Sequence, residues 1–153
     1  MGGYEMTAVE AKGVVIERPV GDVWRFMVDS SNMHLWEDSG AEWTQTSEGP
    51  VGLDTTITSS IRKLGRVMKT ELRVAEFEVD RTFAVEATSG FAKGTRIRYV
   101  MAAVDDGSTR LNRVTELRLR GLARLLRPFE AISKLTGEME AKSVKRVMES
   151  RGP

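Results

Sequence analysis

The chain carries few side chains that could do chemistry at neutral pH. Its 153 residues include one histidine, His34, and no cysteine. This composition excludes disulfides, thiol nucleophiles, thiolate zinc sites, iron–sulfur ligation and any site with several histidine ligands. No spacing of Asp and Glu resembles a calcium-binding loop. We therefore expect neither a metal nor another cofactor.

His34 is the default candidate for general acid–base catalysis, because histidine is the side chain that most readily exchanges protons near neutral pH. A catalytic base also needs neighbours that orient its ring, and Met33 and Leu35 cannot do so. The sequence therefore favours a surface histidine, and we assign no catalytic residue.

An arginine lies in an alternating segment at residues 109–120. One face of this segment carries Leu111, Arg113, Thr115, Leu117 and Leu119. The leucines predict that this face turns toward the core, so Arg113 should be buried with them. A buried guanidinium group must be paired. Arg113 is therefore either the anchor for a carboxylate or phenolate ligand, or half of a salt bridge to a neighbouring Asp or Glu.

Two further candidates for a binding site come from residues 95–104. Tyr99 and Met101 share one face of this segment, whereas the opposite face begins with Arg96 and Arg98. The face of Tyr99 is thus predicted to turn inward. There its hydroxyl group would offer a polar contact in an apolar pocket, and Met101 would adapt to the shape of a ligand.

Hydrophobic periodicity predicts the elements that position these residues. Apolar side chains at spacings of three and four indicate a helix over residues 20–28, and a second helical turn carries Trp36. Alternation then predicts strands, and the short connections between them imply antiparallel hairpins. The expected strands are residues 7–17, 41–46, 53–62, 66–78, 82–87, 95–104 and 109–120.

A long amphipathic helix is predicted over residues 121–150. Phe129 and Ile132 lie on its apolar face and are expected to line a cavity opposite the sheet. Pro128 either kinks this helix or lies in the first turn of a helix that begins near Arg127. The predicted fold is α+β: a curved, seven-stranded antiparallel sheet wraps around the C-terminal helix, and two short helices follow the first strand.

The composition is typical of one globular domain over residues 1–153, with an ordered core at about 7–150. Apolar residues make up 41% and charged residues 29% of the chain. No run approaches the ~20 apolar residues of a membrane-spanning helix, and the N-terminal residues show no signal-peptide pattern. We therefore expect a cytoplasmic protein without stable membrane insertion.

Two segments resemble a known superfamily. They are residues 16–29, followed by Asn32 and Trp36, and the Gly-Ser-Thr-Arg-Leu hairpin at residues 107–111. Both are similar to the START-related lipid-transfer and polyketide cyclase/dehydratase superfamily (SRPBCC), which has the helix-grip fold. The resemblance implies an apolar pocket between the sheet and the long helix, open at one end, with Trp36 near its mouth. It carries over no catalytic residues, because members share the scaffold and differ in activity.

Three classes of function follow. The first is binding or transport of a hydrophobic small molecule, either a lipid or a polyketide-like compound. The second is a cyclase or dehydratase enzyme, although no cluster of His, Asp and Glu supports it. The third is a protein-interaction module associated with ribosomes or chaperones. Its basis is an excess of basic residues at 117–153, nine Lys and Arg against four Asp and Glu.

The basic residues are not interleaved with exposed aromatic side chains, as they are in proteins that bind single-stranded nucleic acids. We therefore expect no nucleic-acid partner. The alternative explanation of the basic C-terminal region is a solvated helix face, which the sequence favours over an anionic partner. The sequence leaves open whether the chain forms a homodimer.

Overall fold

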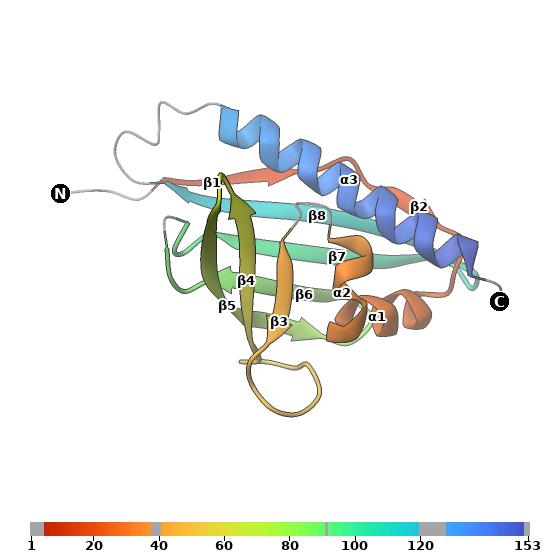
Figure 1. The fold of residues 1–153 in the computed structure, drawn as a ribbon. Coiled ribbons are helices and arrows are strands. Elements are labelled where there is room, and N and C mark those ends of the chain that lie inside the picture. The colour runs from red at the N-terminus through yellow and green to blue at the C-terminus, as the bar shows by residue number, and fades with distance from the viewer. Residues whose placement is uncertain (1–4, 38–40, 91, 120–127, 152–153) are drawn as a thin grey trace.

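An antiparallel sheet curves around one long helix in the computed structural model, which describes residues 5–37, 41–90, 92–119 and 128–151 (Figure 1). The strands are β1 (Glu5–Glu10), β2 (Val14–Ile16), β3 (Glu42–Gln45), β4 (Thr56–Lys63), β5 (Arg66–Glu78), β6 (Thr82–Ala87), β7 (Arg96–Asp105) and β8 (Ser108–Leu119). The helices are α1 (Val20–Val28), the 3-10 turn η1 (Ser30–Asn32), α2 (Met33–Trp36) and α3 (Pro128–Ser150).

The sheet is a meander that is completed by the N-terminal strands. Its order is β1-β8-β7-β6-β5-β4-β3, with β2 also paired to β8. Each strand from β3 to β8 pairs with its neighbour in sequence, as the short connections predicted. The described helices lie on the concave face, where α3 runs along β8 and the N-terminal strands (Figure 1).

In the described part of the chain the sheet has eight strands instead of the predicted seven, because the expected first strand is divided. Glu10 pairs with Val114, but Val14 pairs with Leu111. Residues 11–13 therefore face only two residues of β8, which is the geometry of a bulge with one extra residue. Local alternation could not reveal this irregularity, because it concerns the pairing with β8.

The buried face predicted for α3 was wrong. In the described residues α3 begins at Pro128, one of the two alternatives predicted, and its missing N–H is tolerated there. Residues 121–127 of the predicted helix lie outside the described residues. Ile132 was expected to line a cavity opposite the sheet, but its side chain is 57% exposed. Leu135 and Met139, at helical spacing from it, are likewise 59% and 45% exposed. The buried side of α3 instead carries smaller or polar residues: Glu140, Ala141, Ser143 and Val144, followed by Met148.

A chain of aromatic rings crosses the concave face of the sheet. Trp24 of α1 makes an edge contact with Phe83, which stacks on Tyr99 with ring centroids 4.8 Å apart. Tyr99 then meets the edge of Trp36, which in turn contacts Trp43. Such contacts add to the apolar area that these rings bury, and they attach α1 and α2 to the sheet.

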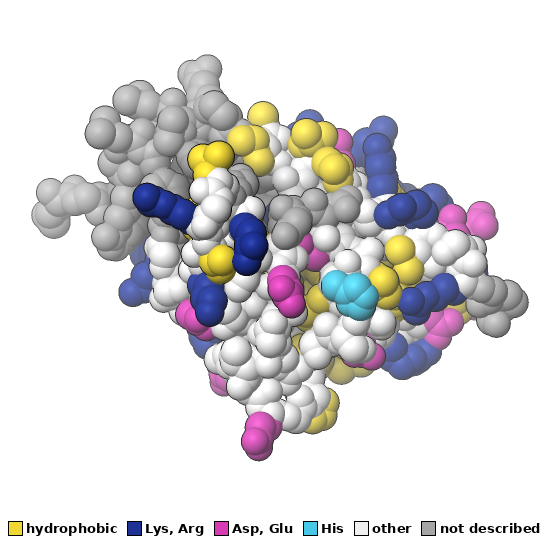
Figure 2. Space-filling view, in the orientation of Figure 1, with side chains coloured by type: hydrophobic (Ala, Val, Ile, Leu, Met, Phe, Trp, Pro, Cys, Tyr) yellow, Lys and Arg dark blue, Asp and Glu magenta, His cyan; other side chains and the backbone are white. Residues whose placement is uncertain are grey.

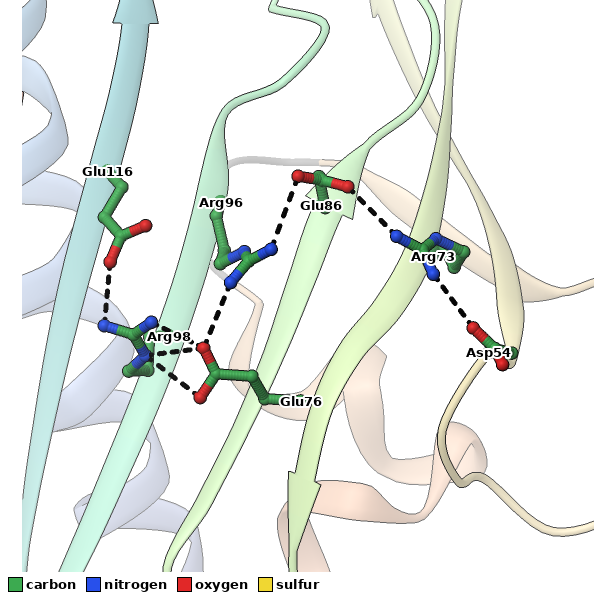
Figure 3. Close-up of polar contacts among 7 residues, drawn as sticks. All are labelled: Asp54, Arg73, Glu76, Glu86, Arg96, Arg98 and Glu116. Carbon is green, nitrogen blue, oxygen red and sulfur yellow. Dashed lines mark hydrogen bonds and ion pairs between the residues drawn. The ribbon is translucent and has the colours of Figure 1, made fainter. Parts of the chain in front are cut away.

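The outer face of the sheet carries a continuous network of ion pairs (Figure 3). Its members, in spatial order, are Glu116, Arg98, Glu76, Arg96, Glu86, Arg73 and Asp54. At its centre Glu76 accepts hydrogen bonds from Arg98 at 2.5 Å and from Arg96 at 3.2 Å. Networks of this kind contribute more to stability than isolated surface pairs.

A bulge in β5 makes this network possible. Leu72 and Val74 face the core, and strict alternation would turn Glu76 inward as well. The pairing with β6 shifts between Val74 and Glu76, so Ala75 is the extra residue. Because the shift reverses the alternation, Glu76 points outward and Phe77 points inward. The ring of Phe77 packs against that of Trp24, with 5.1 Å between the ring centroids.

We predict that Glu76→Gln lowers the free energy of unfolding at neutral pH. The hydrogen bond from Arg98, and then the positive charges of Arg98 and Arg96, lower the pKa of Glu76 from its usual 4.5. A lowered pKa in the folded state gives stability that is present above pH 4.5 and is lost as the pH falls below it. In urea unfolding, the difference between wild type and variant should therefore shrink in acid and at high salt. A difference that is the same at every pH would contradict this role.

Candidate functional site

A buried ion pair joins the sheet to the long helix. Arg113 of β8 donates a hydrogen bond through Nη1 to Glu140 Oε1 of α3. The Tyr99 hydroxyl of β7 donates to Glu140 Oε2 at 3.1 Å. The side chains of Arg113 and Glu140 are only 7% and 4% exposed. We call Tyr99, Arg113 and Glu140 the polar cluster. It shows that the salt bridge, one of the two alternatives predicted for Arg113, is formed.

Strand pairing and a close helix approach bring the cluster together. Tyr99 lies directly opposite Arg113 in the pairing of β7 with β8, so both side chains leave the same face of the sheet. Gly137 lies one turn before Glu140 on α3. A Cβ atom at Gly137 would lie 3.1 Å from Arg113 Cδ and 2.6 Å from Ala11 Cβ. The missing side chain therefore lets α3 lie directly over Arg113.

In the polar cluster, Tyr99 and Arg113 act as hydrogen-bond donors and the Glu140 carboxylate acts as the acceptor. Burial, and then the negative charge of Glu140, raise the pKa of Tyr99 well above its ordinary 10.0. The phenol is therefore protonated at neutral pH and acts as a donor. Arg113 Nε is also buried and has no hydrogen-bond partner among the described residues. The cluster thus keeps one buried donor that is not used.

A cavity of about 220 Å³ lies against the cluster and is partly open to solvent. Its accessible wall is mostly apolar, and Arg113 with two carboxylates supplies its charged groups. The lining residues are Glu37, Trp43, Ser59, Thr70, Leu72, Val85, Ala87, Ala92, Thr95, Ile97, Arg113, Thr136 and Glu140.

The space on the other side of the cluster is filled. A gap there is bordered by Met27, Leu111 and Val144 and has no room for a water molecule. The polar cluster therefore separates a packed core from an open cavity. Among the described residues, no group of three or more His, Asp or Glu side chains is placed to hold a metal ion.

The sequence matches the family described as polyketide cyclase / dehydrase and lipid transport over residues 6–149. The chain belongs to this family. Its curved sheet and long helix are the helix-grip fold that the resemblance implied. A search of curated proteins finds no significant match.

Solved structures with this fold include members with several activities. The Zhui aromatase/cyclase from Streptomyces sp. R1128 has a TM-score of 0.77 at 16% identity, over 96% of both chains. TTHA0849 from Thermus thermophilus has a TM-score of 0.75 at 15% identity, over 95% of this chain and 100% of the other. Norcoclaurine synthase from Thalictrum flavum, in complex with dopamine and hydroxybenzaldehyde, has a TM-score of 0.74 at 10% identity, over 98% of this chain and 90% of the other. Identities this low establish the fold alone.

In this polyketide cyclase-like fold, the predicted site residues occupy three environments. Arg113 lines the cavity. Tyr99, Met101 and Trp36 are buried in the core behind it, at 1%, 3% and 0% exposure, and they do not border the cavity. Ile132 is on the exposed side of α3, away from the cavity lining. Phe129 lies in the first turn of α3, and its side chain is outside the described part of the structure.

Sequence reasoning missed Glu140, Glu37, Trp43 and Thr136, all of which line the cavity. A glutamate on a helix usually indicates a solvated face, which hides Glu140. One signal was available: Gly137, Ala141, Val144 and Met148 recur at spacings of four, three and four. This stripe of mostly small residues is the buried face of α3, and Glu140 lies beside it.

We predict that Gly137→Ala destabilises the protein, although alanine favours a helix by about 1 kcal/mol over glycine. The new Cβ would lie 2.6 Å from Ala11 Cβ, so α3 must move away from β8. Overpacking of this kind costs about 1–3 kcal/mol. Adding Ala11→Gly removes the near atom and should restore most of the unfolding free energy measured in urea. Failure of this double variant to recover would show that the helix approach is not limited by Ala11.

We predict that Tyr99→Phe costs about 1–2 kcal/mol at neutral pH, because it leaves a buried carboxylate oxygen with one donor fewer. The raised pKa of Tyr99 means that folded wild type keeps a proton that the unfolded chain loses above pH 10.0. Wild-type stability therefore falls above this pH, whereas the variant lacks this loss. Urea unfolding should show the two proteins converging in alkaline solution. A constant difference would mean that Tyr99 does not hold its proton in the folded state.

Proposed function

We propose that this protein binds a small, uncharged and largely apolar molecule in the cavity, with a hydroxyl or carbonyl group at the polar cluster. The observation that carries the proposal is the buried pair of Arg113 and Glu140 at the wall of an otherwise mostly apolar cavity. Pockets of this composition hold a ligand by its apolar area and orient it through a few polar contacts.

The charge of the lining favours an uncharged ligand over the carboxylate or phenolate considered from the sequence. In the described lining, the guanidinium group of Arg113 is already paired with the carboxylate of Glu140. An anion bound beside Arg113 would therefore also lie close to the Glu140 carboxylate in a poorly solvated site. A carbonyl or hydroxyl group can instead hydrogen-bond at the polar wall without bringing a charge into the site.

The volume of the cavity favours a compact ligand. At about 220 Å³ it is smaller than the roughly 300–1,000 Å³ of pockets for drug-sized ligands. One or two fused rings fit this space, whereas a lipid with long acyl chains needs more. The family description includes both polyketide chemistry and lipid transport, and the cavity supports the ring-shaped class of ligand.

Proton-transfer catalysis is the alternative, and the geometry of Glu140 argues against it. Both oxygens of the Glu140 carboxylate already accept hydrogen bonds, one from Arg113 and one from Tyr99, so each is engaged within the protein instead of being directed at a substrate proton. His34 is exposed and is not among the cavity-lining residues (Figure 2). Binding without turnover is therefore the function that the site supports best.

Native mass spectrometry of the protein, purified without denaturation, tests for a resident ligand directly. A mass excess that is released on unfolding would support binding and identify the ligand class. Recovery of a chemically altered compound after incubation would instead support the enzymatic alternative.

We predict that 2-naphthol binds and raises the melting temperature by mass action, and that 2-naphthoate, its anionic counterpart, binds at least about tenfold more weakly. Ser59→Phe should abolish 2-naphthol binding, because Ser59 lines the cavity and a phenyl ring would fill it. Ser60→Phe is the matched control on the other face of β4 and should leave binding unchanged. Equal binding of the two naphthalene compounds, or equal loss in both variants, would contradict the proposed site.

A further inference from the structure

The hairpin of β4 and β5 ends in an unusual combination of side chains. Residues 61–70 contain four basic residues, no acidic residue and four large apolar residues. Leu64, Val67 and Met68 are 102%, 52% and 61% exposed. Figure 2 shows hydrophobic and basic side chains gathered over this hairpin. We call residues 61–69 the hairpin tip.

Leu64 is locally unfavourable where it stands. Lys63 pairs with Arg66, so Leu64 and Gly65 form a two-residue turn. Their φ angles are 52° and 75°, the left-handed region that such turns require. Asn-Gly is the favoured sequence there, and leucine is strained because of its Cβ atom. Leu64 also gains nothing from packing, since it is fully exposed. Neither turn geometry nor core packing explains this residue.

The hairpin tip continues the two strands that line the cavity. Ser59 and Thr70 line the cavity, and Ile61 and Met68 are paired with each other two residues closer to the turn on the same face. Thr136 of α3 also lines the cavity. The exposed apolar side chains of α3 identified above, at positions 132, 135 and 139, lie within a turn of Thr136. Exposed apolar side chains therefore lie close in sequence to cavity-lining residues on two elements, the β4–β5 hairpin and α3.

The basic residues of the tip differ from those on the outer face of the sheet. There the arginines are joined to carboxylates in the network of Figure 3. Arg62, Arg66 and Lys69 are exposed and make no ion pair with any residue in the described ranges. Their charges are available to an anionic partner.

We propose that the hairpin tip docks on an anionic lipid surface, with Leu64 and Met68 in its apolar layer and Arg62, Arg66 and Lys69 at the headgroups. A protruding apolar tip with cations around it matches a lipid interface, which has no preformed pocket and carries negative charge. Docking would be peripheral, because no helix among the described residues is long and apolar enough to cross a bilayer.

Docking in this orientation brings the end of the strands that line the cavity close to the lipid. An apolar ligand could then enter without crossing water. This consequence rests on the proposed function, whereas docking itself does not depend on any ligand.

The test is flotation of the purified protein with two kinds of vesicle, phosphatidylcholine alone and phosphatidylcholine mixed with phosphatidylglycerol. We expect binding to the mixed vesicles only, and weaker binding as salt rises. Leu64→Asn should weaken it about tenfold through lost apolar insertion. The same change creates the favoured Asn-Gly sequence in the turn. The melting temperature of the Leu64→Asn variant should therefore equal or exceed that of wild type. Leu53→Asn is the matched control, since Leu53 is 62% exposed in the loop at the opposite end of β4 (Figure 1).

Charge variants test the second half of the proposal without touching the turn. Arg62→Ser and Lys69→Ser should each weaken binding to the mixed vesicles about fivefold. Arg110→Ser, which changes an exposed arginine of β8, should leave it unchanged. Absence of binding at low salt, or equal binding by wild type and Leu64→Asn, would overturn the proposal. A dimer in solution that Leu64→Asn dissociates would also overturn it, and would assign the tip to a second copy of the chain.

Discussion

The ion pair of Arg113 and Glu140 is the constraint around which the rest of the structure is arranged. Burying either charged group by itself would cost a large desolvation free energy. The buried pair is stable only where the geometry between the two groups is fixed. Fixing it requires α3 to lie close over β8, which Gly137 permits. Tyr99 supplies the second donor to Glu140. A well-packed apolar replacement could be as stable as such a pair, so its position at the boundary between core and cavity favours a role in orienting a ligand.

The sequence predicted the elements well and their contacts poorly, for a physical reason. The bounds of α1, β5 and β6 follow from periodicities of 3.6 and 2, which are local properties of the chain. The buried face of α3 was misjudged because large apolar residues outweigh small ones in a periodic pattern. In the folded protein, small residues such as Gly137 and Ala141 decide which face can approach the sheet.

The candidate site was half predictable for the same reason. Alternation placed Arg113 and Tyr99 on the inner face, and the cost of burying a charge required a partner for Arg113. Only the tertiary structure identifies that partner as Glu140, 27 residues away on a different element. The bulge at Ala75 was equally hidden, since it is defined by pairing with β6. Its effect is large, because it moves Glu76 out of the core and into the network on the outer face.

The two faces of the sheet show where this molecule departs from local optimality. On the outer face the central carboxylates and guanidinium groups are paired, so that surface is already satisfied. The unfavourable features gather instead at the hairpin tip and on the exposed side of α3: a leucine in a left-handed turn, exposed apolar residues on α3 and cations without ion-pair partners in the described structure. Sequences tend to agree with their fold at every level except where function requires otherwise. Because several independent departures meet at one end of the molecule, that end is where contact with a partner is best explained.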